Sequence, residues 1–216
     1  MLPFTAEVLF SLHGRYLSAQ WLPIGVVLIV TLAAVLAVAL CRAQRGRLSG
    51  GLLAIGWLWV GAVFHLQYFA TLNFAAPVYG GMFLLQAALL AWQGPVRSRL
   101  PMCRRQDAVG RAGLLIALYA LAIYPLLDLS DAGTIDTLRL AGTAPGPTAL
   151  LTLGLLLQLQ RPVPLYLLVV PVAWALVAGF SGWVLGLTAD LLLPVSAVAG
   201  LGVTLWHRHR QRPPAG

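Results

Sequence analysis

Long apolar runs alternate with short polar segments along almost the whole chain. A helix needs about 20 mainly apolar residues to cross roughly 30 Å of membrane hydrocarbon. Runs close to that length predict seven membrane-spanning helices, at residues 22–41, 50–70, 76–94, 112–129, 146–160, 163–185 and 190–206. The connections between these runs are too short to build a soluble core. The pattern therefore predicts an all-α, polytopic transmembrane bundle that forms a single domain over residues 22–206.

The fifth run, residues 146–160, is the shortest, and a helix of that length reaches only about 22 Å. A re-entrant loop would also fit, but it would separate Arg161 and the tail arginines from the other arginine-rich loops. We therefore expect this run to be a span, and whether it crosses fully stays open. The preceding segment Ala144–Thr148 is rich in proline and glycine, and we expect it to dip into the outer leaflet against protein.

In the first 21 residues, apolar and polar residues alternate at helical spacing instead of forming one long apolar run. Apolar and aromatic residues recur on one face, namely Phe4, Val8, Leu9, Leu12 and Tyr16. Polar residues recur on the other face, namely Glu7, Ser11, Arg15 and Ser18. This pattern predicts a short amphipathic helix over residues 1–21, lying flat in the outer membrane interface. At the other end, residues 207–216 are expected to form a basic cytoplasmic tail.

Composition supports the membrane assignment. Hydrophobic residues make up 60% of the chain and charged residues only 9%, whereas a soluble domain has about 25% charged residues. These proportions exclude an ordinary soluble domain and a disordered chain. The formal charge of +8 is the difference between 14 basic and 6 acidic residues, and all 14 basic residues are arginines, because the chain has no lysine. The arginines cluster in loops between the spans, which points to membrane topology rather than to nucleic-acid binding.

Arginine placement predicts the orientation. With seven spans, one side of the membrane carries Arg42, Arg45, Arg47, Arg97, Arg99, Arg104, Arg105, Arg111, Arg161, Arg208, Arg210 and Arg212. Only Arg15 and Arg139 fall on the other side. Because cytoplasmic loops carry the excess of positive charge, we expect the N-terminus outside and the C-terminus in the cytoplasm. The expected location is the inner (plasma) membrane, with the bilayer and its anionic lipid headgroups at the cytoplasmic face as partners.

Ionisable residues inside spans are costly and are treated as functional hypotheses. His65, Asp128 and Asp190 are the ionisable residues in the predicted spans, and all three lie at the outer side. Asn73 and Tyr124 share that depth. We therefore predict one outer-facing polar pocket with His65 at its base and Asn73, Tyr124, Asp128 and Asp190 on its walls. This requires the second, fourth and seventh spans to be neighbours.

Structural interpretations of the same residues stay open. His65 could donate a hydrogen bond to a carbonyl or to Gln86 on the third span. Asp128 could be solvated at the membrane edge. Asp190 could sit in the first turn of a helix capped by Thr188, where an acidic residue suits the helix dipole.

The sequence contains no complete constellation of a known enzyme class. It has no phosphate-binding glycine-rich loop, metal-ligand cluster or catalytic triad. Gly179-Phe180-Ser181-Gly182 resembles the GxSG motif of rhomboid-type intramembrane proteases. Such an enzyme needs a histidine on a later span, whereas His207 and His209 lie in the tail. No second histidine lies inside a span to complete a bis-histidine haem site. We therefore assign no catalytic, cofactor-binding or metal-binding residue and expect no cofactor.

Several short motifs resemble those of an uncharacterised family of bacterial multi-pass membrane proteins, a domain of unknown function. They are Met1-Leu2-Pro3-Phe4-Thr5, Leu58-Trp59 followed by His65, Asn73, Leu85-Gln86, Tyr124-Pro125-Leu126, Pro147-Thr148 and Arg161-Pro162-Val163-Pro164. Members of that family often have a cysteine just before the Pro-Thr pair, where this chain has Gly146. The resemblance implies a multi-pass topology and an outer-leaflet site, but no reaction.

Three classes of function fit these features. A permease for a small solute or proton needs a polar path through the membrane, but the inner half offers only Gln158 and Gln160. A membrane sensor or accessory subunit explains an outward site and a basic surface for an unidentified membrane or cytoplasmic protein partner. A membrane-embedded enzyme acting on lipid or quinone has the least support. The sequence does not decide between the first two classes and does not indicate a ligand.

Overall fold

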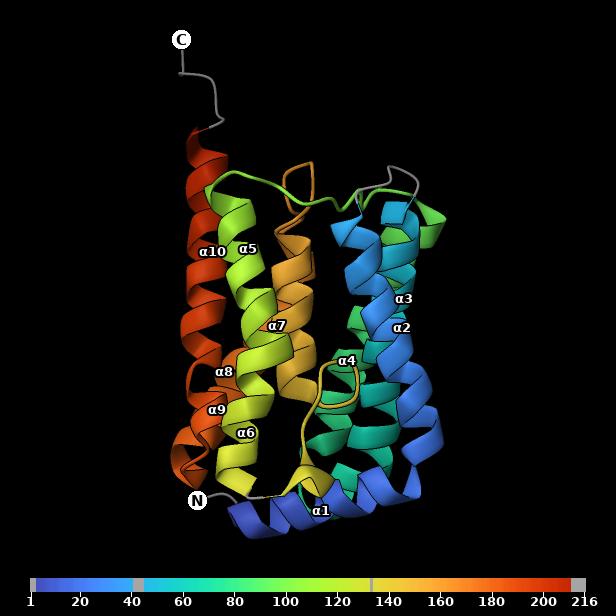
Figure 1. Cartoon of the computed structure of the whole chain (residues 1–216), viewed down its shortest axis with the longest axis vertical. Coiled ribbons are helices and arrows are strands. Elements are labelled where there is room, and N and C mark those ends of the chain that lie inside the picture. Colours follow the sequence, from blue (N-terminus) through green and yellow to red (C-terminus); the bar gives the residue numbers. More distant parts are fainter. Residues whose placement is uncertain (1–2, 41–44, 133, 211–216) are drawn as a thin grey trace.

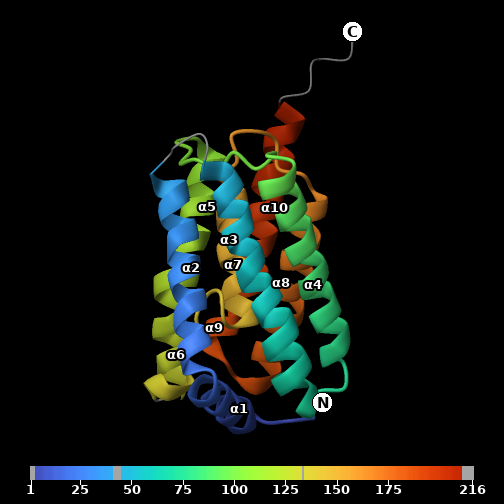
Figure 2. The same cartoon turned by 90° about the vertical axis from the view of Figure 1, so that its right-hand side faces the viewer.

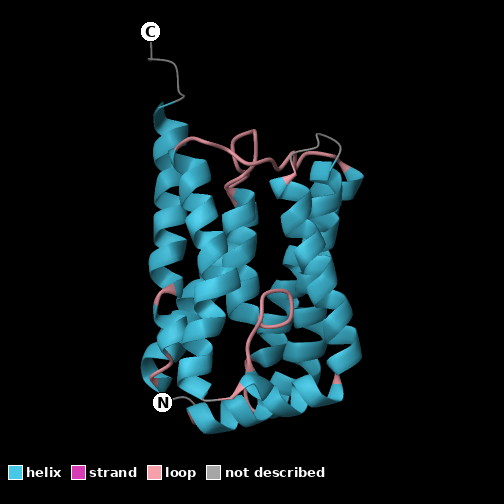
Figure 3. Cartoon of the chain, in the orientation of Figure 1, coloured by secondary structure: helices cyan, strands magenta, loops and turns pink. Residues whose placement is uncertain are grey.

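A computed structural model describes residues 3–40, 45–132 and 134–210 of the chain. These residues form an elongated bundle of helices that run along one axis, and they contain no β-strand (Figures 1 and 3). Helix α1 (Ala6–Ala19) is the exception, since it lies across one end of the bundle. We call this the α1 end. The opposite end, where α10 (Leu193–Arg210) finishes, is called the tail end.

The long helices follow the predicted apolar runs, and several change helical type along their length. In chain order they are α2 (Trp21–Ala39), α3 (Arg45–Trp59) with its continuations η1 (Val60–Tyr68) and η2 (Phe69–Thr71), α4 (Ala76–Ala91) with η3 (Trp92–Val96), and α5 (Ala108–Leu118) with η4 (Tyr119–Ile123) and α6 (Tyr124–Ala132). After the short η5 (Ile135–Thr137) come α7 (Pro145–Leu156), α8 (Tyr166–Leu185), α9 (Thr188–Leu191) and α10. Segments η1, η3 and η4 are π-helical.

Among the described residues, 5 helical segments are long and apolar enough to cross a membrane. They are Trp21–Ala39, Arg47–Thr71, Ala108–Ala132, Tyr166–Leu185 and Thr188–Arg210. The prediction of an all-helical chain with membrane-type helices is therefore confirmed at this level. The remaining two predicted spans coincide with α4 and with α7, which is apolar but short.

Helix boundaries differ from the predicted ones for local reasons. Helix α8 begins at Tyr166, because Pro162 and Pro164 interrupt the preceding turn. Helix α7 ends at Leu156, four residues early, because the following segment pairs with another loop: the amide of Gln160 donates to the carbonyl of Pro101 at 3.1 Å.

Helix α7 occupies the interior of the bundle. All of its residues are buried, and it contacts α5, α8, α10 and α3. At 12 residues it is only about 18 Å long. The loop before α7 enters the bundle from the α1 end (Figure 1). Leu140 is half-buried, and the residues from Ala141 to Ala144 are buried. Loop and helix together thus fill the centre of the bundle, and the segment Ala144–Thr148 is packed against protein.

The turn in this loop is fixed by Gly142 and Thr148. Gly142 has φ of +93°, and a Cβ there would lie 2.0 Å from Thr31 Oγ1 on α2. Its amide donates to Thr148 Oγ1 at 2.8 Å, and that hydroxyl donates to the carbonyl of Ala144 at 2.5 Å. Only glycine combines this left-handed conformation with such close packing.

Helix α1 turns its apolar face toward the bundle. Leu9, Leu12, His13 and Tyr16 are its buried residues. The Tyr16 hydroxyl donates to the carbonyl of Thr143 at 3.0 Å. The amphipathic pattern therefore reflects packing on protein, and α1 closes this end of the bundle (Figures 1 and 2). Val8, expected on the apolar face, is exposed.

Candidate functional site

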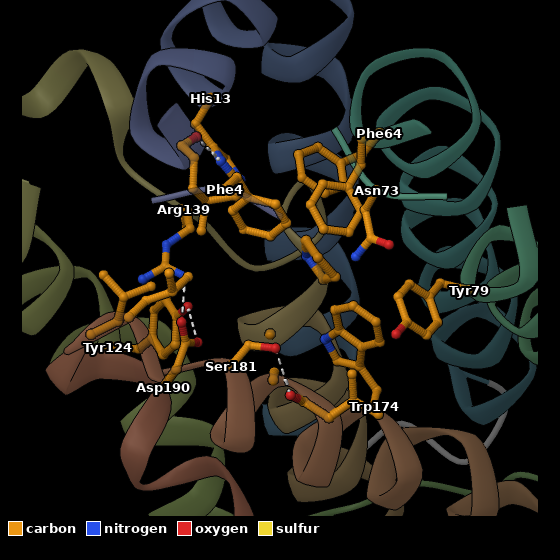
Figure 4. A pocket seen from close by; sticks show the side chains of 18 residues that line it. Phe4, His13, Phe64, Asn73, Tyr79, Tyr124, Arg139, Trp174, Ser181 and Asp190 are labelled. Carbon is orange, nitrogen blue, oxygen red and sulfur yellow. Dashed lines mark hydrogen bonds and ion pairs between the residues drawn. The ribbon is translucent and has the colours of Figure 1, made fainter. Parts of the chain in front are cut away.

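A partly enclosed pocket lies behind α1, between the loop before α7 and helices η1, α4 and α8 (Figure 4). Its volume of about 80 Å³ is enough for roughly five water molecules. Its walls are mainly apolar and aromatic, with a few polar groups. The lining residues are Phe4, Leu9, His13, Phe64, Phe69, Asn73, Tyr79, Tyr124, Arg139, Pro145, Gly146, Trp174, Val177, Ala178, Ser181, Leu185, Leu187 and Asp190.

Arg139 forms the charged side of the pocket. Its Nη1 donates to Asp190 Oδ2 at 2.5 Å, and its Nε donates to Asp128 Oδ1 at 2.7 Å. The backbone amide of Arg139 also donates to Asp128 Oδ2, at 2.7 Å. Both carboxylates are thus bound to one guanidinium, and Asp128 is held by the backbone as well. The loop after η5 supplies the arginine, whereas α6 and α9 supply the acids.

Asp190 is also held from the other side. The Tyr124 hydroxyl donates to Asp190 Oδ1 at 2.7 Å. The short helix α9 is anchored in turn, because the Tyr119 hydroxyl donates to the carbonyl of Ala189 at 2.6 Å and Asp131 Oδ2 accepts from its amide at 3.1 Å. The break between α9 and α10 therefore places the Asp190 carboxylate firmly at the pocket wall.

The ion-pair cluster is almost completely buried. The exposed fractions are 0% for Asp128, 4% for Asp190 and 5% for Arg139. Burial alone would lower the pKa of Arg139, but the charge of Asp190 and the further interactions with Tyr124 and Asp128 hold that pKa well above its ordinary value. Arg139 is therefore a permanent cation. With two carboxylates against one guanidinium, the ionised cluster carries one excess negative charge.

His13 lines the same pocket and carries an unpaired acceptor. Its Nδ1 lies 3.1 Å from the carbonyl of Leu9, which can only accept, so Nδ1 carries the proton. Nε2 is then the acceptor, and it has no hydrogen-bond partner among the described residues. Burial, followed by the nearby charge of Arg139, lowers the pKa of His13 to about 3. The imidazole therefore stays neutral at physiological pH.

The wall opposite Arg139 carries further polar groups. The indole Nε1 of Trp174 is buried and has no hydrogen-bond partner among the described residues. Asn73 Oδ1 accepts from the amide of Ala75 at 2.9 Å, so its amide nitrogen remains a donor. Figure 4 shows Trp174, Tyr79 and Asn73 facing Arg139, Tyr124 and Asp190 across the pocket. The pocket thus offers donors, acceptors and charge around an aromatic space.

The structure brings some of the predicted site residues together. Asn73, Tyr124 and Asp190 line the pocket, and Asp128 lies behind Arg139, to which it is bonded. Asp128 is buried rather than solvated. Asp190 lies in the first turn of α9, as the structural interpretation expected, but Thr188 does not cap the helix, because α9 begins without a side-chain cap. The Asp190 carboxylate instead binds Arg139 and Tyr124.

His65 has a different environment from the expected one. It is fully buried and does not line the pocket. Its ring contacts aromatic rings, with centroids 4.7 Å from Phe83 and 5.0 Å from Trp174. Neither ring nitrogen has a hydrogen-bond partner among the described residues. Gln86 donates instead to the carbonyl of Leu167. His65 therefore supports the aromatic wall from behind.

Sequence reasoning did not include Arg139, His13 and Trp174 in the site. Arg139 lies in the loop between η5 and α7, and an arginine in a loop is usually taken to indicate the orientation of the neighbouring spans. The available signal was its position, since it is one of only two arginines on the minority side of the charge separation. His13 and Trp174 carried no such signal, because both fit an ordinary helix face.

The chain belongs to a family of unknown function, DUF6064, whose match covers residues 6–214. The match includes every residue of the pocket except Phe4. Neither a curated protein nor a solved structure matches the chain.

Proposed function

We propose that this chain is a seven-span inner-membrane protein that binds a small ligand in the α1-end pocket and works as a membrane sensor or accessory subunit. The main observation that supports a sensor or accessory role is the buried position of α7. All of its residues are buried, and the helix runs along the middle of the bundle from Pro145 and Gly146 at the pocket toward the tail end (Figure 1). A pocket with a buried, packed helix between it and the tail end suits recognition rather than passage.

Contacts around α7 support this interpretation. A Cβ on Gly113 of α5 would lie 2.6 Å from the carbonyl oxygen of Gly154, so these two helices meet without space between them. On the other side of α7, the indole of Trp57 donates to Thr152 Oγ1 at 2.7 Å. Opening a passage would require α7 to leave both contacts. Interiors packed in this way resist continuous deformation.

The arginine distribution supports the orientation that we propose. Exposed arginines at the tail end include Arg97, Arg99, Arg104, Arg161 and Arg210. At the α1 end, the described arginines are Arg15 and Arg139, and Arg139 is neutralised by its carboxylates. The positive-inside rule then puts the tail end in the cytoplasm. The basic tail-end surface is available to anionic lipids or to a partner protein.

A permease is the second candidate, and one observation favours it. Helices α9 and α10 form a discontinuous helix whose short first part carries Asp190. Transporters commonly build their binding sites from such broken helices. In that case α9 would move relative to α10 and expose the pocket to the other side.

Purified full-length protein in liposomes distinguishes these candidates. Stopped-flow light scattering would follow entry of glycerol, urea and choline chloride, and a pH-sensitive dye would follow protons. The sensor or accessory role predicts rates equal to those of protein-free liposomes, whereas a faster rate for any solute or for protons supports the permease.

The orientation is tested separately with reporter fusions in cells. Green fluorescent protein fused after Gly216 should fluoresce, and alkaline phosphatase fused at the N-terminus should be active. An inactive phosphatase with a non-fluorescent tail would contradict the proposed orientation, whereas an active phosphatase with a non-fluorescent tail would put both termini on the same side and contradict seven spans.

A further inference from the structure

The pocket combines an excess negative charge with aromatic walls. Arg139 and Asp190 both line it, and Asp128 lies behind Arg139, so two ionised carboxylates share one guanidinium and leave one excess negative charge. Because all three charged groups are buried, water screens the excess charge poorly. A buried net charge is costly unless a partner compensates it. A cation in the pocket would supply that compensation.

Aromatic rings surround the space next to these charges. The rings that line it belong to Phe4, Phe64, Phe69, Tyr79, Tyr124 and Trp174. The face of an aromatic ring attracts cations, and aromatic cages recognise quaternary ammonium groups in particular. A metal ion is a poor candidate, because metal ions need several oxygen, nitrogen or sulfur ligands, whereas most of this lining is hydrocarbon.

Two side chains that line the pocket each carry a buried polar atom without a partner among the described residues. His13 is 2% exposed and offers Nε2 as an acceptor, whereas Trp174 is 6% exposed and offers Nε1–H as a donor. Leaving such groups unsatisfied costs stability. A ligand that donates to His13 and accepts from Trp174 would satisfy both, and a hydroxyl group can do either.

We propose that the pocket binds a small organic ammonium compound that carries a hydroxyl or similar hydrogen-bonding group. The ammonium lies among the aromatic rings close to Asp190, and the polar group reaches His13 or Trp174. This inference rests on the proposed function, because it identifies the ligand class of the same pocket. Arg139 stays bound to its two carboxylates throughout and orders the site without contacting the ligand's charge.

Three probes of similar size and shape but different charge test whether binding depends on the positive charge of the ligand. Choline carries the cation, 3,3-dimethylbutan-1-ol is its uncharged carbon analogue, and 3,3-dimethylbutanoate carries a negative charge. Isothermal titration calorimetry on the full-length protein in detergent should show choline binding at least about tenfold more tightly than the alcohol. The carboxylate should be the weakest of the three.

Other results have distinct meanings. If the alcohol or the carboxylate binds as tightly as choline, the cation inference is wrong and the pocket remains a binding site. If none of the three binds at millimolar concentration, both the cation inference and the ligand-binding role are wrong.

Two sets of variants test the contributions within the pocket. Asp128→Asn removes the excess charge, so it should reduce the preference for choline over the alcohol about tenfold. The preference is a ratio of two affinities measured on the same variant, so a general weakening of binding by disturbed packing would leave it unchanged. Trp174→Phe should keep most of the choline affinity and Trp174→Leu should lose it, because only phenylalanine retains a ring face. An equal effect of both tryptophan substitutions, or an unchanged preference in Asp128→Asn, would overturn the proposal.

Discussion

Arg139 and Asp190 form an ion pair with 2.5 Å between Nη1 and Oδ2, although 51 positions separate them in the chain. Arg139 lies in the loop that enters the bundle before α7, and Asp190 lies at the break between α9 and α10. The pair therefore ties the central loop to the last helical segment. Through Asp128 the same guanidinium also reaches α6. One side chain thus joins three parts of the chain at the α1 end.

Removing this arginine should destabilise the protein strongly. Arg139→Met keeps much of the side-chain volume but leaves Asp128 and Asp190 buried without their counter-charge. Breaking one partner of a buried ion pair typically costs about 3–5 kcal/mol. Thermal unfolding in detergent should show a clearly lower Tm for Arg139→Met and an intermediate value for Arg139→Lys.

Arg15 on α1 provides the control, because its side chain is exposed. Arg15→Met should leave the Tm nearly unchanged, since surface charges contribute little to stability. Similar losses for the two arginine variants would mean that the cluster does not hold the α1 end together.

The helices could be predicted from the sequence because a long apolar run by itself indicates a segment that is buried in protein or in lipid. The depth of Asn73, Tyr124 and Asp190 followed from their places along these runs, and the three do line one pocket. Their partner Arg139 could not be predicted in the same way. It reaches the site only because the loop before α7 enters the bundle, and no local pattern encodes that path.

His65 shows the opposite case. Its depth was estimated from the sequence, but the direction of its side chain depends on how η1 is rotated. The π-helical geometry of Val60–Tyr68 changes the number of residues per turn, so an ordinary helical wheel misplaces residues along it. The ring of His65 consequently lies among Phe83, Trp174 and other rings rather than beside a carboxylate.

The turn at Gly142 should tolerate no side chain. Gly142→Ala would force a Cβ to within 2.0 Å of Thr31 Oγ1 and would hold a non-glycine residue at φ of +93°. Strain of this kind costs roughly 1–3 kcal/mol before the steric clash is counted. The Tm of Gly142→Ala should fall, and Thr31→Ala in the same chain should restore only part of the loss.

Gly202 on α10 is the matched control for this prediction. A Cβ there meets nothing within 4 Å, and alanine favours helices more than glycine does. Gly202→Ala should therefore leave the Tm unchanged or raise it slightly. Full recovery of Gly142→Ala by Thr31→Ala would show that the backbone conformation imposes no strain of its own.

Gln158 should matter for stability at the tail end. It is buried, its Nε2 donates to the carbonyl of Gly110 at 2.7 Å, and its Oε1 accepts from the amide of Arg105 at 2.9 Å. Gln158→Leu leaves both backbone groups without this partner, which should cost about 1–3 kcal/mol for each buried group that stays unsatisfied. Chemical denaturation should register the loss. Gln160→Leu, at an exposed position, should have a much smaller effect, and equal effects would contradict the assignment.

The last prediction concerns the pH dependence that His13 introduces. The pKa of His13 in the folded protein is about 3, lowered from 6.5 by burial and then by the charge of Arg139. Between pH 6.5 and 3 the unfolded chain therefore binds a proton at His13 that the folded chain does not. Stability should fall as the pH drops through this window, by about 1.4 kcal/mol per pH unit, and His13 should have no effect above it.

His13→Phe should remove this contribution, because phenylalanine keeps the ring contact with Phe64 and cannot be protonated. The measured quantity is the difference in Tm between wild type and variant from pH 7.5 to 4.5, so contributions from Arg139, His65 and the carboxyl groups largely cancel. Wild type should lose stability relative to His13→Phe only below about pH 6.5. His209→Phe, at an exposed position on α10, should track wild type throughout. A constant difference between wild type and His13→Phe across this range would mean that His13 is not buried in the neutral form between α1 and the rest of the bundle.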